Sequence, residues 1–189
     1  MNRFEKAIAF AACKHSGTVR KLDSAPYILH PMEVALIVSG LTHDEDVFCA
    51  AVLHDTVEDT DTSIEEIREL FGERTAALVA SETEDKRPGI PKSQSWRIRK
   101  EESLQKLEAA EDIGVKQIWL GDKLSNLRGI HRAWLRLGSD VFLSFNQKDP
   151  RQHAWYYRSI CALLSELDET EAWKQLNALV EEIFGEVRE

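Results

Sequence analysis

The most informative part of the sequence is residues 50–60, Ala50-Ala51-Val52-Leu53-His54-Asp55-Thr56-Val57-Glu58-Asp59-Thr60. Together with the apolar residues just before it, this stretch predicts a helix over 45–57, with Asp44 as its N-terminal cap. A helix that is apolar on every side is typical of the centre of a core. We therefore expect 45–57 to be a central buried helix.

Four ionisable side chains crowd the end of this apolar stretch: His54, Asp55, Glu58 and Asp59. Helical spacing places Glu58 over His54 and Asp59 over Asp55, one turn apart. Burying an unpaired charge costs several kcal/mol, so these groups need partners. A divalent cation held by His54 and Asp55 would be such a partner, and it would leave the second carboxylate pair close to a water molecule beside the ion.

Two further metal ligands are suggested by residues elsewhere in the chain. His30 stands at a predicted helix start after the apolar residues 26–29, which would press it inward. Asp122 interrupts an otherwise core-like helix, where an Asp is locally unfavourable, and Asn126 lies one turn later on the same face. Imidazole and carboxylate ligands without thiolate suit manganese, iron or zinc. Taken singly, each residue also fits a plainer reading, because a lone His on an apolar helix is more often a satisfied core residue.

The rest of the chain also reads as helical, with polar residues spaced for one wet face. Ser63 and Glu66 form a capping box at one helix start, and Gly72 ends that helix. No segment alternates as a strand does, and a loop is expected over 88–91. Helices are expected at 3–15, 30–39, 45–57, 64–71, 73–82, 93–110, 113–137, 150–167 and 171–184. The prediction is one all-α domain.

The composition excludes several classes of protein. The 189 residues include 24 Lys and Arg against 33 Asp and Glu, a net charge of −9, and 43% are hydrophobic, enough for one well-buried core. We find no apolar run of about 18 residues that would span a membrane, and the N-terminus does not resemble a signal peptide. Three scattered cysteines indicate a reducing compartment, so we expect a cytoplasmic protein. A net acidic chain is also a poor generic binder of nucleic acid.

Charge is segregated along the chain. Between Lys21 and Arg68 there is no Lys or Arg, while the segment 86–100 holds six of them and no acid. Such segregation fits a cation-binding centre flanked by a region suited to an anionic ligand. From charge counts alone, two solvated faces of opposite sign explain it better. The pattern therefore motivates a search for chemistry and does not decide it.

The order of several motifs along the chain resembles a known family. The motifs are Arg20-Lys21, Pro26-Tyr27-Ile28-Leu29-His30-Pro31-Met32-Glu33-Val34-Ala35, residues 50–60, Phe71-Gly72, Leu78-Val79 and Asp122-Lys123-Leu124-Ser125-Asn126-Leu127. They resemble the HD-domain phosphohydrolases, specifically the hydrolase domain of the bifunctional alarmone synthetase/hydrolases and the stand-alone small alarmone hydrolases. The resemblance covers about 15–170, and the combination is far more specific than the His54-Asp55 pair alone.

The resemblance implies a single all-α HD-type domain over 1–189, a bundle of about eight to ten helices with a C-terminal helix at about 170–187. It implies a metal-dependent (p)ppGpp 3′-pyrophosphohydrolase, which releases pyrophosphate from guanosine 3′,5′-bis(diphosphate) with a bound Mn²⁺ or another divalent transition metal. Because the chain ends soon after the matching region, we expect hydrolysis alone, without the synthetase activity of the bifunctional members.

The resemblance also assigns roles to residues by their position in the motifs. The implied metal ligands are His30, His54, Asp55 and Asp122. The implied catalytic pair, which orients and deprotonates the attacking water, is Glu58 and Asp59. The implied substrate-binding residues are Arg20, Lys21, Lys92, Asn126 and Tyr156. The arginine and lysines of this set would neutralise a polyphosphate that the carboxylates otherwise repel.

Two departures from the family pattern keep other functions open. The loop 84–96 is longer than in the small alarmone hydrolases, and Gln152 stands where they often carry a basic residue one turn before the tyrosine. One alternative is therefore a phosphohydrolase of another nucleotide or dinucleotide phosphate. A second is a non-catalytic nucleotide-sensing domain, against which the presence of Glu58 and Asp59 speaks. The expected partner is a small-molecule nucleotide, with no nucleic acid and no membrane, and the last helix is expected to be a packing or homodimer element.

Overall fold

Helices account for the regular structure in the part of the chain that the computed structural model describes, residues 1–87 and 89–187. These residues contain no strand, only an isolated bridge between Val19 and Pro26. None of their helices is long and apolar enough to cross a membrane. The bounds are α1 (Arg3–Lys14), α2 (Leu29–Val38), α3 (Glu45–Leu53), α4 (Thr56–Asp59), α5 (Ile64–Phe71), α6 (Glu73–Glu82), α7 (Lys92–Glu108), α8 (Ile113–Leu137), α9 (Pro150–Leu163) and α10 (Glu171–Phe184), with 3-10 helices η1 (Gly138–Ser144) and η2 (Ser165–Leu167). The all-α prediction is confirmed, and the ten α-helices of the described residues agree with the expected eight to ten.

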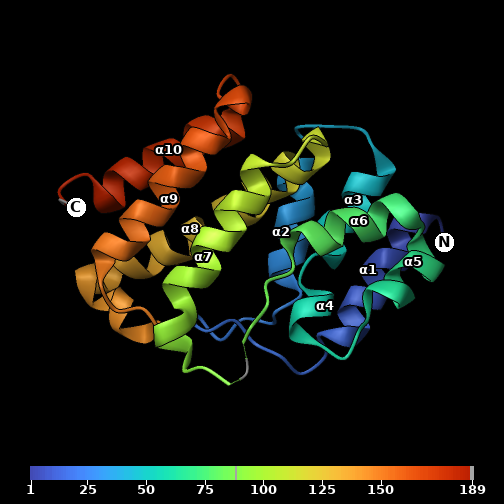
Figure 1. The fold of residues 1–189 in the computed structure, drawn as a ribbon, viewed down its shortest axis with the longest axis horizontal. Coiled ribbons are helices and arrows are strands. Elements are labelled where there is room, and N and C mark those ends of the chain that lie inside the picture. The colour runs from blue at the N-terminus through green and yellow to red at the C-terminus, as the bar shows by residue number, and fades with distance from the viewer. Residues whose placement is uncertain (88, 188–189) are drawn as a thin grey trace.

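The longest helix, α8, connects the two halves of the structure. It packs against α2, α3 and α6 from the N-terminal half and against η1 and α10 from the C-terminal half. In Figure 1, α1 and α5 lie at one end of the molecule, α9 and α10 lie toward the other, and α8 runs between them. Six of the nine residues of α3 are buried, so this apolar helix lies in the core as the sequence predicts.

Two helices, α3 and α4, replace the one helix expected over 45–57, which corrects the sequence prediction. At the break between α3 and α4, side chains form hydrogen bonds to backbone carbonyl oxygens. Nδ1 of His54 donates to the carbonyl oxygen of Ala51 at 2.9 Å. The hydroxyl of Thr56 donates to the carbonyl oxygen of Leu53 at 2.6 Å. Because such bonds compete with helical ones, the chain turns here, and the turn presents its side chains to the interior.

The remaining helix ends follow their sequence signals, with three differences. At Ser63 the described residues show only half of the expected capping box, since its hydroxyl accepts from the N–H of Glu66 but the Glu66 side chain does not bond back. Expected cap residues accept hydrogen bonds from helical N–H groups at Asp44, Ser63, Asp149 and Thr170. α9 ends before the expected residue 167, and η2 follows it. After α8 the chain enters η1, which the sequence analysis did not expect, at Gly138 with φ of +57°. Of the expected loop, Pro88 lies outside the described residues, and 89–91 are not helical.

Close contact between α2 and α8 depends on Gly121. A Cβ atom placed there would lie 3.0 Å from Cγ2 of Val38, 3.1 Å from Cγ1 of Val34 and 3.2 Å from the carbonyl oxygen of Val34. A methyl group would therefore push the two helices apart. Since His30 lies in the first turn of α2 and Asp122 directly follows Gly121, this contact also sets the distance between those two side chains.

We expect Gly121→Ala to lower the free energy of unfolding by about 1 kcal/mol. Overpacking costs about 1–3 kcal/mol, which outweighs the gain of at most about 1 kcal/mol that alanine brings to a helix interior. Urea denaturation followed by circular dichroism measures the change. Gly129→Ala is the matched control on the same helix, because the nearest atom to its Cβ would be Nη2 of Arg20 at 3.0 Å, the end of a flexible side chain. A Gly121→Ala protein at least as stable as the control would contradict the packing role.

Candidate active site

Four side chains from three separate parts of the chain meet in the interior. His30 comes from the start of α2, His54 and Asp55 from the turn between α3 and α4, and Asp122 from α8. Nε2 of His30 lies 3.1 Å from Oδ1 of Asp122 and 3.4 Å from Oδ2 of Asp55. Nε2 of His54 lies 3.1 Å from Oδ2 of Asp55 and 3.6 Å from Oδ1 of Asp122. The fold thus brings together the four residues that the resemblance assigns to a metal ion.

The geometry and chemistry of this ligand cluster, His30, His54, Asp55 and Asp122, fit a divalent metal. Two atoms bound about 2.1 Å from one ion at right angles lie about 3 Å apart, close to the separations above. One ligand atom each from His30, His54 and Asp122 lies within 4.8 Å of the others. Nε2 of His54 is buried and makes no hydrogen bond in the part of the chain that the structure describes. A buried nitrogen of this kind, among imidazoles and carboxylates without thiolate, suits manganese, iron or zinc.

The second ring nitrogen of each histidine is held by a neighbour that fixes the ring. Nδ1 of His54 bonds to the carbonyl oxygen of Ala51, so it must carry the proton. Nδ1 of His30 lies 2.9 Å from Oγ of Ser125, and that hydroxyl donates to Oε2 of Glu33 at 2.7 Å, so Nδ1 is again the donor. In a neutral imidazole these bonds leave the proton on Nδ1, so each Nε2 atom then offers a lone pair to the cluster, which is the form that binds a metal.

Further side chains that the sequence analysis did not assign support the cluster from behind. The hydroxyl of Tyr27 donates to Oδ2 of Asp55 at 2.6 Å and to Oδ2 of Asp59 at 3.2 Å, which links a ligand to the predicted catalytic pair. Nη1 of Arg128 donates to Oε1 of Glu33 at 3.0 Å. The sequence signal for Tyr27 is its place one turn before the first histidine, whereas Glu33 and Arg128 look like ordinary surface charges.

The ligand residues shift one another's pKa. Burial by itself lowers the pKa of an imidazole, but the nearby carboxylates raise the pKa of His30 and raise that of His54 further. Burial by itself raises the pKa of a carboxyl group. His54 and His30 nevertheless hold the pKa of Asp55 well below its usual range. Lys123 and the two imidazoles hold the pKa of Asp122 well below its usual range. Both carboxylates are therefore ionised at neutral pH, and a bound dication would replace the protons on the imidazoles.

The predicted catalytic pair lies on α4, at the edge of the cluster. Burial raises the pKa of Glu58, and the charges of Asp55 and Glu84 raise it further. Nζ of Lys86 donates to Oδ1 of Asp59 and to the carbonyl oxygen of Glu58, both at 2.6 Å. A carboxylate with a raised pKa is a better base near neutral pH, so Glu58 is suited to accept a proton beside the ligand cluster.

Glu82, at the end of α6, is a buried acid that the sequence analysis did not single out. Its Oε1 atom finds no hydrogen-bond partner within residues 1–87 and 89–187. Burial raises its pKa to about 8, against the opposing effect of Lys123. At neutral pH it is therefore mostly protonated and adds little negative charge. The available signal was an acid two residues after the apolar stretch Ala76-Ala77-Leu78-Val79-Ala80.

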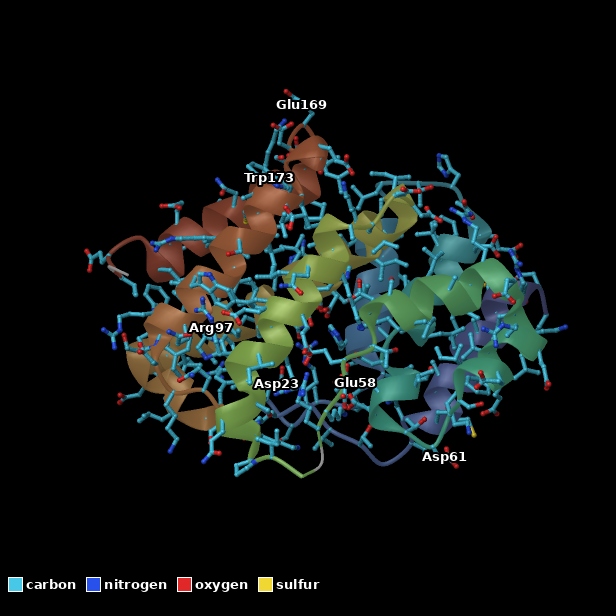
Figure 2. The ribbon with its side chains drawn as sticks, viewed as in Figure 1. Asp23, Glu58, Asp61, Arg97, Glu169 and Trp173 are labelled. Carbon is cyan, nitrogen blue, oxygen red and sulfur yellow. The ribbon has the colours of Figure 1, made fainter. Side chains whose placement is uncertain are left out.

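Two adjoining cavities lie beside the cluster. Figure 2 labels one lining residue of each, Glu58 of the acidic cavity and Asp23 of the basic cavity. The acidic cavity, about 210 Å³, is lined by Tyr27, His30, His54, Asp55, Glu58, Asp59, Glu82, Glu84, Arg99, Lys100, Asp122, Lys123 and Asn126. The basic cavity, about 280 Å³, is lined by Arg20, Lys21, Leu22, Asp23, Tyr27, His30, Trp96, Lys100, Lys123, Asn126, Gly129, Ile130, Phe145, His153, Tyr156 and Tyr157. Five lining residues are common to both, so one ligand can extend from one cavity into the other.

Most of the predicted substrate-binding residues line the basic cavity, namely Arg20, Lys21, Asn126 and Tyr156. Nδ2 of Asn126 donates to Oδ1 of Asp122 at 2.5 Å, which fixes the amide at the junction of the cavities. The hydroxyl of Tyr156 is buried and has no hydrogen-bond partner among the described residues. The structure does not bring Lys92 to either cavity, since its side chain is exposed in the first turn of α7. Sequence reasoning did not assign Lys100 and Lys123, which line both cavities.

Two relatives of different length are similar in sequence to this chain. The guanosine-3′,5′-bis(diphosphate) 3′-pyrophosphohydrolase of Aquifex aeolicus (strain VF5) is 42% identical over 124 residues, 66% of this chain and 17% of that protein. The pyrophosphohydrolase MESH1 of Danio rerio is 41% identical over 133 residues, 68% of this chain and 69% of that protein. The chain therefore spans a small part of the first relative's length and somewhat more than two thirds of the second's.

Solved structures and a family model agree with these relatives. One structure, described as a metazoan ortholog of SpoT that hydrolyzes ppGpp and plays a role in starvation responses, superposes with a TM-score of 0.73 at 28% identity and covers 98% of this chain and 96% of its own. A second, lmo0812 from Listeria monocytogenes EGD-e, has a TM-score of 0.72 at 30% identity and covers 82% of this chain and 99% of its own. The model of the HD domain matches residues 7–149. This chain belongs to the HD domain family.

Proposed function

We propose that this protein is a metal-dependent phosphohydrolase that releases pyrophosphate from the 3′ position of guanosine 3′,5′-bis(diphosphate). The observation that carries the proposal is the pair of joined cavities, one built to hold a cation and the other to hold an anion with an aromatic group. The names of the relatives from Aquifex aeolicus and Danio rerio support the same substrate.

The ligand cluster would hold the metal, and we propose Mn²⁺ because two imidazoles and two carboxylates suit it and the family resemblance implies it. When bound, such an ion polarises a phosphoryl oxygen and lowers the pKa of a water molecule. The protein's own contribution is to keep the two carboxylates ionised and to aim all four ligands. Hydrogen bonds from Nδ1 of His30 and of His54 set the rings, and Tyr27 holds the carboxylate of Asp55.

Glu58 is proposed as the base that takes the proton of the attacking water. It is partly buried beside the cluster, and its pKa is raised by that burial and by Asp55 and Glu84. Asp59, held between the ammonium of Lys86 and the hydroxyl of Tyr27, would orient the water rather than take its proton. The two carboxylates of the pair thus have different surroundings and different proposed tasks.

The basic cavity would bind the rest of the nucleotide. Arg20 and Lys21 line it and would neutralise phosphate groups, which carry several negative charges. Its aromatic residues, among them Trp96 and Tyr156, give flat apolar surface against which a base can pack. Asn126 lies where the two cavities meet, so it would contact the sugar or phosphate next to the bond that breaks.

A second candidate function is hydrolysis of another nucleotide or dinucleotide phosphate by the same site. The observation that favours it is the departure at α7, where Lys92 is exposed and lines neither cavity. Gln152 is also engaged by a neighbour, since it accepts a hydrogen bond from Nη1 of Arg97 at 3.0 Å. A non-catalytic sensing role is less well supported, because sensing needs no buried base such as Glu58.

A nucleotide panel tests the proposed reaction. With Mn²⁺ added, we expect one pyrophosphate for each guanosine 3′,5′-bis(diphosphate) consumed, and loss of the reaction when the metal is removed by a chelator. Phosphate and pyrophosphate are measured separately for the alarmone, GTP and a dinucleotide phosphate. Asp55→Asn, which weakens the ligand cluster, is the inactive control. Monophosphate release from the dinucleotide, with the alarmone untouched, would replace the proposed function by the second candidate.

Glu58→Gln is expected to lower kcat by about 10²–10⁴-fold, because the amide cannot accept the proton. The bound Mn²⁺, measured by metal analysis of the purified protein, should stay the same, since Glu58 lies outside the ligand cluster. Glu69→Gln, an exposed acid on α5, is the matched control and should behave as the unaltered protein. Equal loss of metal and turnover in Glu58→Gln would mean that Glu58 is a ligand and not a base.

Ser125→Ala is expected to weaken Mn²⁺ binding by about 10–100-fold, the usual effect of losing the partner of a ligating histidine. The hydroxyl fixes Nδ1 of His30 and links it to Glu33. Calorimetric titration with Mn²⁺ measures the affinity without any need for turnover. Ser159→Ala serves as control, because among the described residues that hydroxyl donates to the carbonyl oxygen of Trp155 on α9, away from the ligand cluster. Unchanged affinity in Ser125→Ala would show that the ring of His30 is held by packing alone.

A further inference from the structure

Lys100 lies on α7 at the junction of the two cavities and has no role in the function proposed above. It lines both cavities, as do Tyr27, His30, Lys123 and Asn126. A nucleotide whose scissile phosphate lies beside the ligand cluster and whose base lies in the basic cavity must pass its phosphate groups through this junction. An ammonium at that point therefore meets the phosphates and not the base.

Lys100 shares its carboxylate partner with a second cation. Nζ of Lys100 donates to Oε1 of Glu84 at 2.6 Å, and Nη1 of Arg99 donates to Oε2 of the same carboxylate at 2.7 Å. One carboxylate thus faces two cations, and the hydroxyl of Ser103 donates to it as well, at 3.1 Å. Burying surplus charge is unfavourable unless an ion of opposite sign completes the site, and an anionic ligand would do so.

The ammonium also keeps the capacity to bind a ligand. A lysine has three N–H donors, and the described contacts use Nζ for Glu84 and place it 4.9 Å from the ring centre of Tyr156. Lys123, the other lysine at the junction, contacts a residue of the ligand cluster instead. Its Nζ contacts Oδ2 of Asp122 and lies 4.4 Å from the ring centre of Trp119, so it supports the ligand cluster.

We propose that Lys100 binds the phosphate groups of the substrate at the junction of the two cavities and so sets the preference of this protein for a nucleoside polyphosphate. This inference rests on the proposed function for the identity of the substrate. Lys100 acts as a point charge, which suits a phosphate chain better than it suits a planar base. It belongs to the basic segment 86–100, whose exposed member Lys92 lies two turns away on the same helix.

The test compares Lys100→Gln with Lys106→Gln, an exposed lysine of the same helix whose Nζ donates to the carbonyl oxygen of Thr83. The loss of Lys100 should leave the fold intact, because Glu84 keeps Arg99 as its partner. We expect Lys100→Gln to raise KM for guanosine 3′,5′-bis(diphosphate) at least tenfold and to leave the Mn²⁺ affinity unchanged. Lys100→Arg should restore part of the loss, and Lys106→Gln should stay within twofold of the unaltered protein.

A second measurement keeps this proposal separate from the proposed function. Calorimetric titration with inorganic pyrophosphate and with guanosine, both without added metal, measures binding whether or not the alarmone is hydrolysed. We expect Lys100→Gln to weaken pyrophosphate binding at least tenfold and guanosine binding less than twofold. Pyrophosphate affinity within twofold of the unaltered protein, or a larger loss in Lys92→Gln than in Lys100→Gln, would overturn the role of Lys100. Failure of the proposed function would instead appear as absent alarmone hydrolysis by the unaltered protein.

Discussion

The burial of two carboxylates between two imidazoles is the constraint on which the rest of this structure depends. Asp55 and Asp122 are ionised in the interior because His30 and His54 lie within 3.1–3.6 Å of them. Such charges are tolerated only with well-placed partners. Three parts of the chain must therefore stay in close contact, and the packing of α2 against α8 at Gly121 is what allows it.

The local chain is shaped by the same constraint. A continuous helix over 45–57 would place His54 and Asp55 about 100° apart around one axis. The break between α3 and α4 instead brings Nε2 of His54 to 3.1 Å from Oδ2 of Asp55, while Nδ1 is used on the carbonyl oxygen of Ala51. One of the hydrogen bonds that end α3 thus also fixes the histidine ring, so the geometry of this helix end sets the geometry of the ligand.

Much of the fold and of the metal site could be predicted from the sequence because both leave local signals. Apolar periodicity and cap residues gave the helices, and ionisable residues in apolar helices gave His54, Asp55 and Asp122. The break after Leu53 depends on side-chain bonds to backbone carbonyls, which a periodic pattern cannot show. The position of Lys92 depends on the direction in which α7 leaves the preceding loop, so the family resemblance assigned it to a site that the structure does not bring it to. Nothing local distinguishes Lys100 from other lysines, because its partners Glu84, in the loop after α6, and Tyr156, on α9, are distant in the sequence.

The acidic cavity raises the question of how a polyphosphate can approach so many carboxylates, and the surroundings of each acid answer it. Glu82 is mostly protonated at neutral pH, since burial raises its pKa to about 8. Glu84 faces two cations, and Lys86 lies against Asp59. Lys86 also lies 3.6 Å from Oε1 of Glu58. Each carboxylate of this cavity outside the ligand cluster is thus protonated or paired with a cation, and a dication would neutralise the cluster itself, so these acids need not repel a polyphosphate.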